Sequence, residues 1–270
     1  MTEKPIKEDK AADSTELPFV APCRELPLDA PLTWLRRGWQ DFRHAPMPSL
    51  VLGMLLLALS YIIAWATWSY GTLALYLGLG SGFVFIGPVL AVGFYSISRR
   101  LEAGQTVSLG ICLRHGWKPL LRDLIVLGVV ILIVLLVWAR AASMVHIFFP
   151  SEETGDWQAL IPFLAVGSVV GALFAAIVFT ISAFSLPMLV DRKADSITAV
   201  ITSVNAVLRN KKPMIIWASI IVACVITGFA TALFAFAVLL PIIGHATWHA
   251  YRDTIDASAW PSRKNPEDTM

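Results

Sequence analysis

The sequence predicts an all-α membrane protein, a polytopic bundle of about six transmembrane helices arranged as three hairpins. Composition is the first reason, because 57% of the 270 residues are hydrophobic and only 15% are charged. Soluble domains contain roughly 45–50% apolar and about 25% charged residues. The mean hydropathy of +0.69 points the same way. The apolar residues also form runs long enough to cross a bilayer, and the basic residues collect on one side of these runs.

The same composition argues against several classes of protein. A net charge of +2 gives no basic field that could hold a polyanion, so no nucleic-acid partner is expected. The sequence has no phosphate-binding glycine loop, no hydrolase nucleophile motif and no zinc-protease motif. We therefore expect no enzymatic activity.

Both ends of the chain are polar. Residues 1–31 mix charges of both signs with prolines and are predicted to form a flexible cytoplasmic tail. The first long apolar run begins near Leu50, too late for a cleaved signal peptide, so the first span is expected to be an uncleaved anchor. Residues 255–270 are predicted to form a second cytoplasmic tail.

The membrane domain is predicted over residues 32–254. Its expected spans lie at residues 50–70, 73–98, 124–149, 160–190, 214–229 and 232–250. A helix needs about 20 residues to cross the hydrocarbon core, and the last two spans are the shortest. Residues 214–250 could instead form one long helix, or two spans with a turn near Gly228.

The distribution of charge favours six spans. With a cytoplasmic N-terminus, every Lys and Arg except Arg140 then lies on the inner side. The outer loop at 150–157 contains three acidic residues and no basic ones, as the positive-inside rule requires. Five spans would place Arg252, Arg263 and Lys264 outside. Both termini are therefore predicted to be cytoplasmic.

A short repeat and a glycine pair bear on how the helices are organised. The run Leu-Arg-Arg-Gly-Trp at 35–39 recurs as Leu-Arg-His-Gly-Trp at 113–117, each before an odd-numbered span. This favours three units of an interfacial segment and a hairpin, although basic and aromatic residues also favour interfaces for other reasons. Gly167 and Gly171 form a GxxxG pair, for which packing within the chain is favoured over an oligomer interface.

Two histidines form the candidate metal site. His245 and His249 are four residues apart, so a helix places them on one face, within reach of one metal ion or haem edge. Two ligands do not complete a site, but His44 and His115 are expected at the same inner interface, whereas His146 is expected at the outer face. The alternative is a pair of interfacial histidines bonded to headgroups or water.

Arg140 is the only basic residue inside a predicted span. A charge at this depth costs at least about 2.5 kcal/mol on insertion scales and marks a candidate functional site. Arg140 could contact a solute or ion in the bundle. It could also extend toward the outer interface, where Glu152, Glu153 or Asp156 could pair with it.

Three motifs carry a resemblance to a known family: GPVLAVGFYSISRRLE at 87–102, SLPMLVDR at 185–192 and PIIGHATWHAYR at 241–252. Together they resemble a bacterial family of integral membrane proteins with a domain of unknown function. The resemblance covers about residues 32–255, and the last motif is the most specific. It implies a multi-pass protein of the bacterial inner membrane and brings no established activity or catalytic residue.

Some members of that family are labelled cytochrome c oxidase subunit I. That subunit has far more spans and ligand histidines than this chain can supply, so a catalytic oxidase subunit is excluded. The leading hypothesis is an accessory or assembly component that acts through helix contacts with a membrane protein complex, such as a respiratory complex. The sequence also allows a homo-oligomer. The alternatives are a channel or secondary transporter for a small solute or anion, and a metal- or haem-binding membrane protein.

Overall fold

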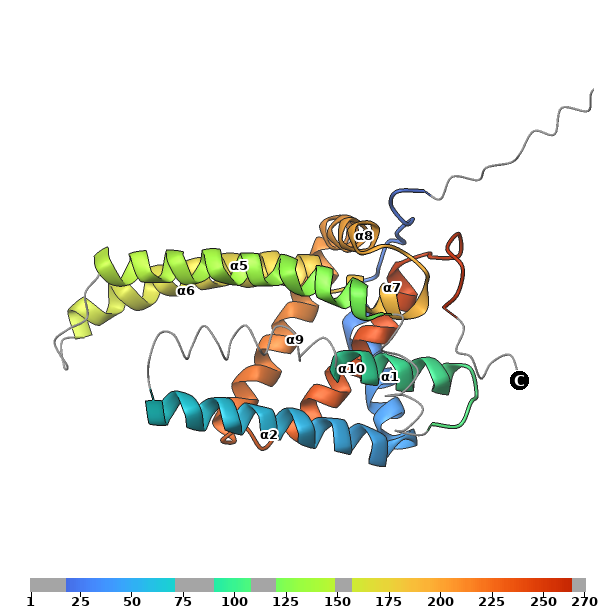
Figure 1. Cartoon of the computed structure of the whole chain (residues 1–270), viewed down its shortest axis with the longest axis horizontal. Helices are drawn as coiled ribbons and strands as arrows, with labels where there is room; N and C mark the ends of the chain where they lie inside the picture. Colours follow the sequence, from blue (N-terminus) through green and yellow to red (C-terminus); the bar gives the residue numbers. More distant parts are fainter. Residues whose placement is uncertain (1–17, 71–89, 108–119, 149–156, 264–270) are drawn as a thin grey trace, which may run out of the picture.

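The computed structural model describes residues 18–70, 90–107, 120–148 and 157–263, which fold into helices (Figure 1). In chain order the helices are α1 (Ala30–His44), α2 (Pro46–Tyr70), α5 (Leu121–Phe148), α6 (Trp157–Ser182), α7 (Ser185–Asp191), α8 (Ser196–Arg209), α9 (Lys211–Ala230) and α10 (Phe236–Thr254). Residues 90–102 are also helical and are called the 90–102 helix. Within the described ranges there is no strand, only two isolated bridges, which confirms the predicted all-α class.

Four helical stretches in the described part of the chain are long and apolar enough to cross a membrane: Pro46–Tyr70, Leu121–Val145, Ile161–Asp191 and Lys211–Ala230. They coincide with the first, third, fourth and fifth predicted spans and confirm a polytopic helical bundle. The second predicted span lies largely outside the described residues. The sixth corresponds to α10, and the total of six spans stays a prediction.

The stretch 214–250 forms two helices rather than one. Ala232 and Leu233 have positive φ angles of 49° and 72°, a conformation that ends a right-handed helix. The turn is held by Leu233 N–H, which donates to Gly228 O at 2.7 Å, and by Thr231 Oγ1, which accepts from Ala235 N–H at 3.1 Å. α9 therefore runs away from the end of the bundle that carries α8, and α10 runs back toward that end (Figure 1).

α10 is the central helix of the bundle, because it packs against α1, α2, α7 and α9. Two glycines allow the closest approaches. A Cβ atom at Gly38 of α1 would lie 2.6 Å from Ile242 O, and one at Gly53 of α2 would collide with Ala237 O. Any larger side chain at these positions would push α10 away from its neighbours.

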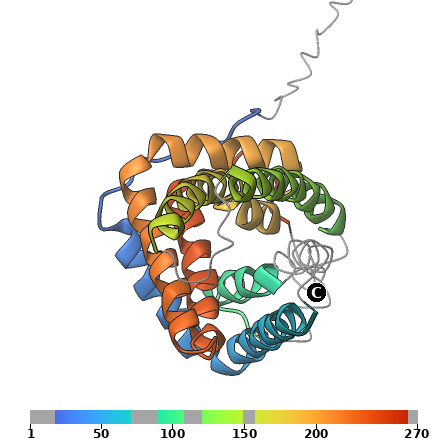
Figure 2. The same cartoon turned by 90° about the vertical axis from the view of Figure 1, so that its left-hand side faces the viewer.

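α5 and α6 form a hairpin that extends away from α10 (Figure 1). The amphipathic helix α8 lies across the end of this hairpin, where it contacts the start of α5 and the end of α6 (Figure 2). We call the end of the bundle that carries α7, α8 and residues 18–29 and 255–263 the base.

The two terminal segments are packed where they are described, which corrects the expectation of flexible tails for these residues. Arg24 N–H donates to Thr254 O at 2.8 Å, and Asp256 N–H donates to Pro22 O at 2.9 Å, so the segments pair with each other. Asn210 accepts from Leu26 N–H at 2.9 Å and ties the first segment to α8. Trp260 is buried in the main core beside these bonds.

Candidate functional site

The three sequence motifs meet at the base, where the 90–102 helix, α7 and α10 lie together. Their side chains form two neighbouring groups. The histidine cluster consists of His245, Ser49 and Ser98. The charged cluster consists of Glu102, Asp191, Arg192, Trp248, Tyr251 and Arg252.

His245 is fully buried and uses both ring nitrogens. Its Nε2 lies 2.9 Å from Ser49 Oγ on α2, and its Nδ1 lies 2.8 Å from Ser98 Oγ on the 90–102 helix. Ser49 donates its one hydroxyl proton to Ala45 O at 2.7 Å, so its oxygen can only accept from the histidine. If Ser49 keeps its bond to Ala45, the proton of the neutral ring lies on Nε2 and Ser98 donates to Nδ1.

Apolar side chains enclose this ring. Phe94 packs edge-on against His245 with ring centroids 5.5 Å apart. Leu52 and Ile97 are fully buried in the same small core. In this apolar surrounding, the two serine bonds join α10 to α2 and to the 90–102 helix.

His249 lies one helical turn further along α10 and has a different partner. Its Nε2 is 2.8 Å from Asp41 Oδ2 on α1, and both side chains are mostly covered. The structure thus places the two predicted histidines on one helix but bonds them to different neighbours. His249 fastens α10 to α1, whereas His245 fastens it to α2.

The metal and haem hypothesis can be compared with this geometry. Within the described ranges, no group of three or more His, Cys, Asp or Glu side chains is placed to hold a metal ion. His44 is exposed and contacts Gln40 O through Nδ1 at 2.8 Å, and His115 lies outside the described residues. A metal ion at His245 would require one of the serine bonds to break. Metal or haem binding stays a prediction.

Glu102 joins the 90–102 helix to α10. Its Oε2 accepts from Trp248 Nε1 at 3.0 Å, and its Oε1 lies 3.2 Å from Arg252 Nη2. Trp248 is fully buried, so its indole N–H needs this acceptor. The acid therefore satisfies a buried donor and pairs with a charge at the same time.

Asp191 plays the corresponding part for α7. Its Oδ2 accepts from Tyr251 OH at 2.9 Å and from Arg192 Nε at 2.9 Å, and it lies 3.6 Å from Arg252 Nη1. Burial raises the pKa of Tyr251, and the Asp191 carboxylate beside it adds to that rise. The phenol is therefore a neutral hydrogen-bond donor at physiological pH.

Arg252 stays charged between the two acids. Burial acts to lower its pKa, but the carboxylates of Glu102 and Asp191 outweigh burial and raise the pKa above its ordinary value. The charged cluster therefore links the ends of three helices through paired charges and charge-assisted hydrogen bonds. Its chemistry suits it to hold these helices in register.

The contacts continue to α5. Arg263 Nη2 lies 3.2 Å from Asp123 Oδ2, and Arg99 donates to Val190 O at 3.3 Å. The C-terminal segment, α5 and α7 are thus connected to the same base. The α5–α6 hairpin is attached at this end.

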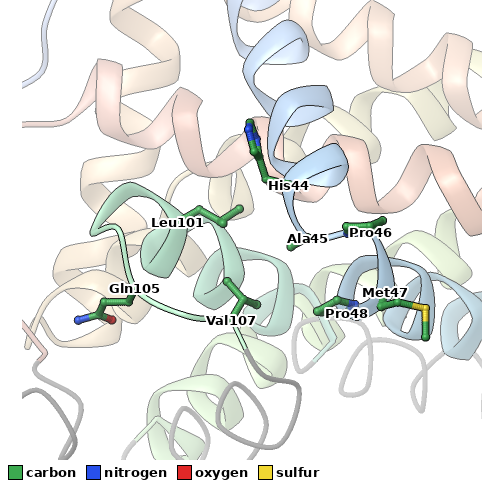
Figure 3. Close-up of a pocket in the computed structure, with 8 residues that line it drawn as sticks. All are labelled: His44, Ala45, Pro46, Met47, Pro48, Leu101, Gln105 and Val107. Carbon is green, nitrogen blue, oxygen red and sulfur yellow. The ribbon is translucent and has the colours of Figure 1, made fainter.

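A cavity of about 360 Å³ lies beside the turn between α1 and α2. Figure 3 shows Leu101 and Val107 on one side of it and Ala45 and Pro48 on the other. Ser49 of the histidine cluster follows directly after Pro48 in the chain. His245 does not line this cavity.

Arg140 lies far from both clusters, on an exposed side of α5. It makes no ion pair with another described residue, and its predicted partners at 152, 153 and 156 fall outside the described ranges. The structure therefore does not bring Arg140 together with the histidines. Its role in solute contact or in reaching the interface stays a prediction.

Sequence reasoning found His245 and His249 but missed the other residues of the two clusters. Ser98, Glu102, Asp191 and Tyr251 all lie inside the three motifs, so their concentration there was the available signal. Ser49 lies outside every motif. No pattern in the sequence distinguished it from the other serines of the spans.

No curated protein and no solved structure matches the chain. A family model matches part of the chain, residues 75–191. The motif at 241–252 lies outside these residues, although its side chains contact two motifs inside them. Residues 75–191 match the family described as a predicted integral membrane protein, DUF2189, which confirms the resemblance carried by the motifs and identifies an integral membrane protein.

Proposed function

We propose that this protein is a non-enzymatic accessory or assembly component that contacts a partner membrane protein complex through its α5–α6 hairpin. One observation carries the proposal: none of residues 161–182 of α6 is buried, although this helix is apolar on all sides. Such a surface needs lipid or another membrane helix to cover it. A respiratory complex is the first partner to test, because some members of the family that the motifs resemble are labelled cytochrome c oxidase subunit I.

The outer half of α6 favours a helix as partner over lipid alone. A Cβ atom at Gly167 or Gly171 would meet no described atom within 4 Å, so packing within the described chain does not use this pair. Packing against the rest of the chain stays a prediction, because most of the second predicted span lies outside the described residues. Small residues at this spacing allow the backbone of a second membrane helix to approach closely.

The attachment of the hairpin supports the same proposal. At the end of α6, Ser203 of α8 donates to Thr180 O at 2.8 Å and accepts from Phe184 N–H at 3.1 Å. Asp123 at the start of α5 pairs with Arg263. The hairpin is thus an apolar arm fixed at one end, a geometry suited to positioning a partner helix.

Purification from native membranes tests the proposal. The tagged protein is extracted in mild detergent, and the proteins that co-purify are identified by mass spectrometry. We expect a stoichiometric partner with the wild type, and at least a tenfold loss with Gly171→Leu, because the added side chain blocks close approach. Val169→Leu is the matched control, because Val169 is 71% exposed on another face of α6.

Two results would contradict the proposal. The wild type could be recovered alone, as a monomer or homo-oligomer. That result would favour the alternative of a channel or transporter, with Arg140 as the candidate solute contact. Alternatively, both variants could retain the partner equally, and the hairpin face would then not be the contact.

A further inference from the structure

A groove of about 530 Å³ opens between α6 and α9 near the base. Ala172 and Ala176 form its α6 wall, Met214 and Ala218 form its α9 wall, and Val207 of α8 closes its end. α9 turns away from α6 as it leaves the base (Figure 1). It lies on the inner half of α6, apart from Gly167 and Gly171.

The interior of the groove has the chemistry of a site for a hydrocarbon chain. Its lining is almost entirely apolar, and the alanines of α6 leave the space that larger side chains would fill. Thr180 is the one hydroxyl in the lining, and it donates to Ala176 O at 2.6 Å. Apart from Lys211 at one end, the lining therefore has no polar group that needs a polar ligand inside the groove.

One end of the groove is positively charged. Lys211 belongs to the lining, and Arg209 and Lys212 flank it in the chain. All three side chains are exposed, and none forms an ion pair with an acidic residue in the described ranges. This end adjoins α8, the amphipathic helix that lies across the inner ends of the hairpin, where lipid headgroups are expected.

We propose that this groove binds an anionic phospholipid, with one acyl chain between α6 and α9 and the phosphate beside Lys211. An amphiphile with a negative head and an apolar tail matches both halves of the site. A partner helix would fill the apolar part but would leave the basic end without a complement. This inference does not depend on the proposed partner at the outer half of α6.

Native mass spectrometry of the purified full-length protein tests the site. The protein is titrated with phosphatidylglycerol or with phosphatidylcholine, and bound lipids are counted at each concentration. We expect tighter binding of phosphatidylglycerol, weakened about fivefold by Lys211→Ala, the factor that corresponds to about 1 kcal/mol for one basic residue near a membrane surface. Ala176→Phe should abolish the specific adduct because it fills the groove.

Each variant has a matched control. Lys193→Ala removes an exposed lysine that does not line the groove, and Ala165→Phe enlarges an exposed alanine of α6 outside it. Both controls should bind as the wild type does. If circular dichroism shows that Ala176→Phe does not fold, the test of the lipid site uses Lys211→Ala alone. The side chain of Lys211 is exposed, so its removal should not disturb folding.

Three outcomes would overturn the proposal. Equal binding of both lipids would remove the headgroup contact, and wild-type affinity in Lys211→Ala would place the lipid elsewhere. A photoreactive residue at position 176 that captures a protein rather than a lipid in native membranes would make a helix the occupant.

Discussion

At the scale of single residues, burial separates two histidines that look alike in the sequence. His245 is enclosed by apolar side chains and bonded through both nitrogens, whereas His249 pairs with Asp41 and keeps some exposure. The sequence could locate both, because they stand four residues apart near a basic helix end. It could not identify Ser49 and Ser98, which lie 196 and 147 residues from His245 along the chain.

The role of His245 leads to a stability prediction. His245→Ala leaves two buried serine hydroxyls without their partner and opens a cavity, so we expect a loss of about 3 kcal/mol in the free energy of unfolding. Denaturant unfolding in detergent measures this loss. His249→Ala is the control and should cost less than half as much, because the side chain of Asp41 can reach water.

The tautomer of His245 provides an independent check. Nitrogen NMR of histidine-labelled protein should show one neutral ring with its proton on Nε2. Ser49→Ala should change that signal, because it removes the acceptor of this proton. A proton on Nδ1 would contradict the hydrogen-bond assignment.

At the scale of elements, the helices that the sequence located best are those whose own composition determines them. Long apolar runs placed four spans within a few residues of their observed limits, because each run needs a bilayer whatever its neighbours are. The central position of α10 was not predictable. It depends on the fit of Gly38 and Gly53 to the backbone of a helix that follows far along the chain.

The start of α8 carries a prediction about pH. Asp195 accepts from the backbone N–H groups of Ile197 and Thr198 at 3.0 and 2.9 Å. Burial acts to raise the pKa of Asp195, but the hydrogen bonds from Thr198 and Ile197 outweigh it and lower the pKa. The charged cap therefore stabilises the fold above the ordinary carboxyl pKa of about 4, and this contribution is lost as the pH falls through the lowered value.

Asp195→Ala should cost about 1 kcal/mol at neutral pH, and the difference from the wild type should shrink in acid. Unfolding of the purified protein at a series of pH values measures both effects. Asp195→Asn is the matched control, because asparagine caps helices well but does not titrate. A loss from Asp195→Ala that stays constant into acid would contradict the role of the charge.

At the scale of the whole molecule, a densely bonded base supports an apolar arm. The sequence described the arm well, but it described the base poorly. Residues 18–29 and 255–263 read as polar tails, because their order comes from pairing with each other and with α8 rather than from their own composition. The candidate site is part of this base, so most of its contacts could only be seen after folding.

The central claim is that the outer half of α6 contacts a partner helix, and photocrosslinking in native membranes tests it most directly. Leu164 lies on the same face as Gly167 and Gly171 and is 51% exposed, so a photoreactive residue there leaves the glycines intact. Val169 is the control position on another face. We predict one crosslinked protein of defined mass from position 164 and only lipid from position 169. Lipid alone from both positions would contradict the account.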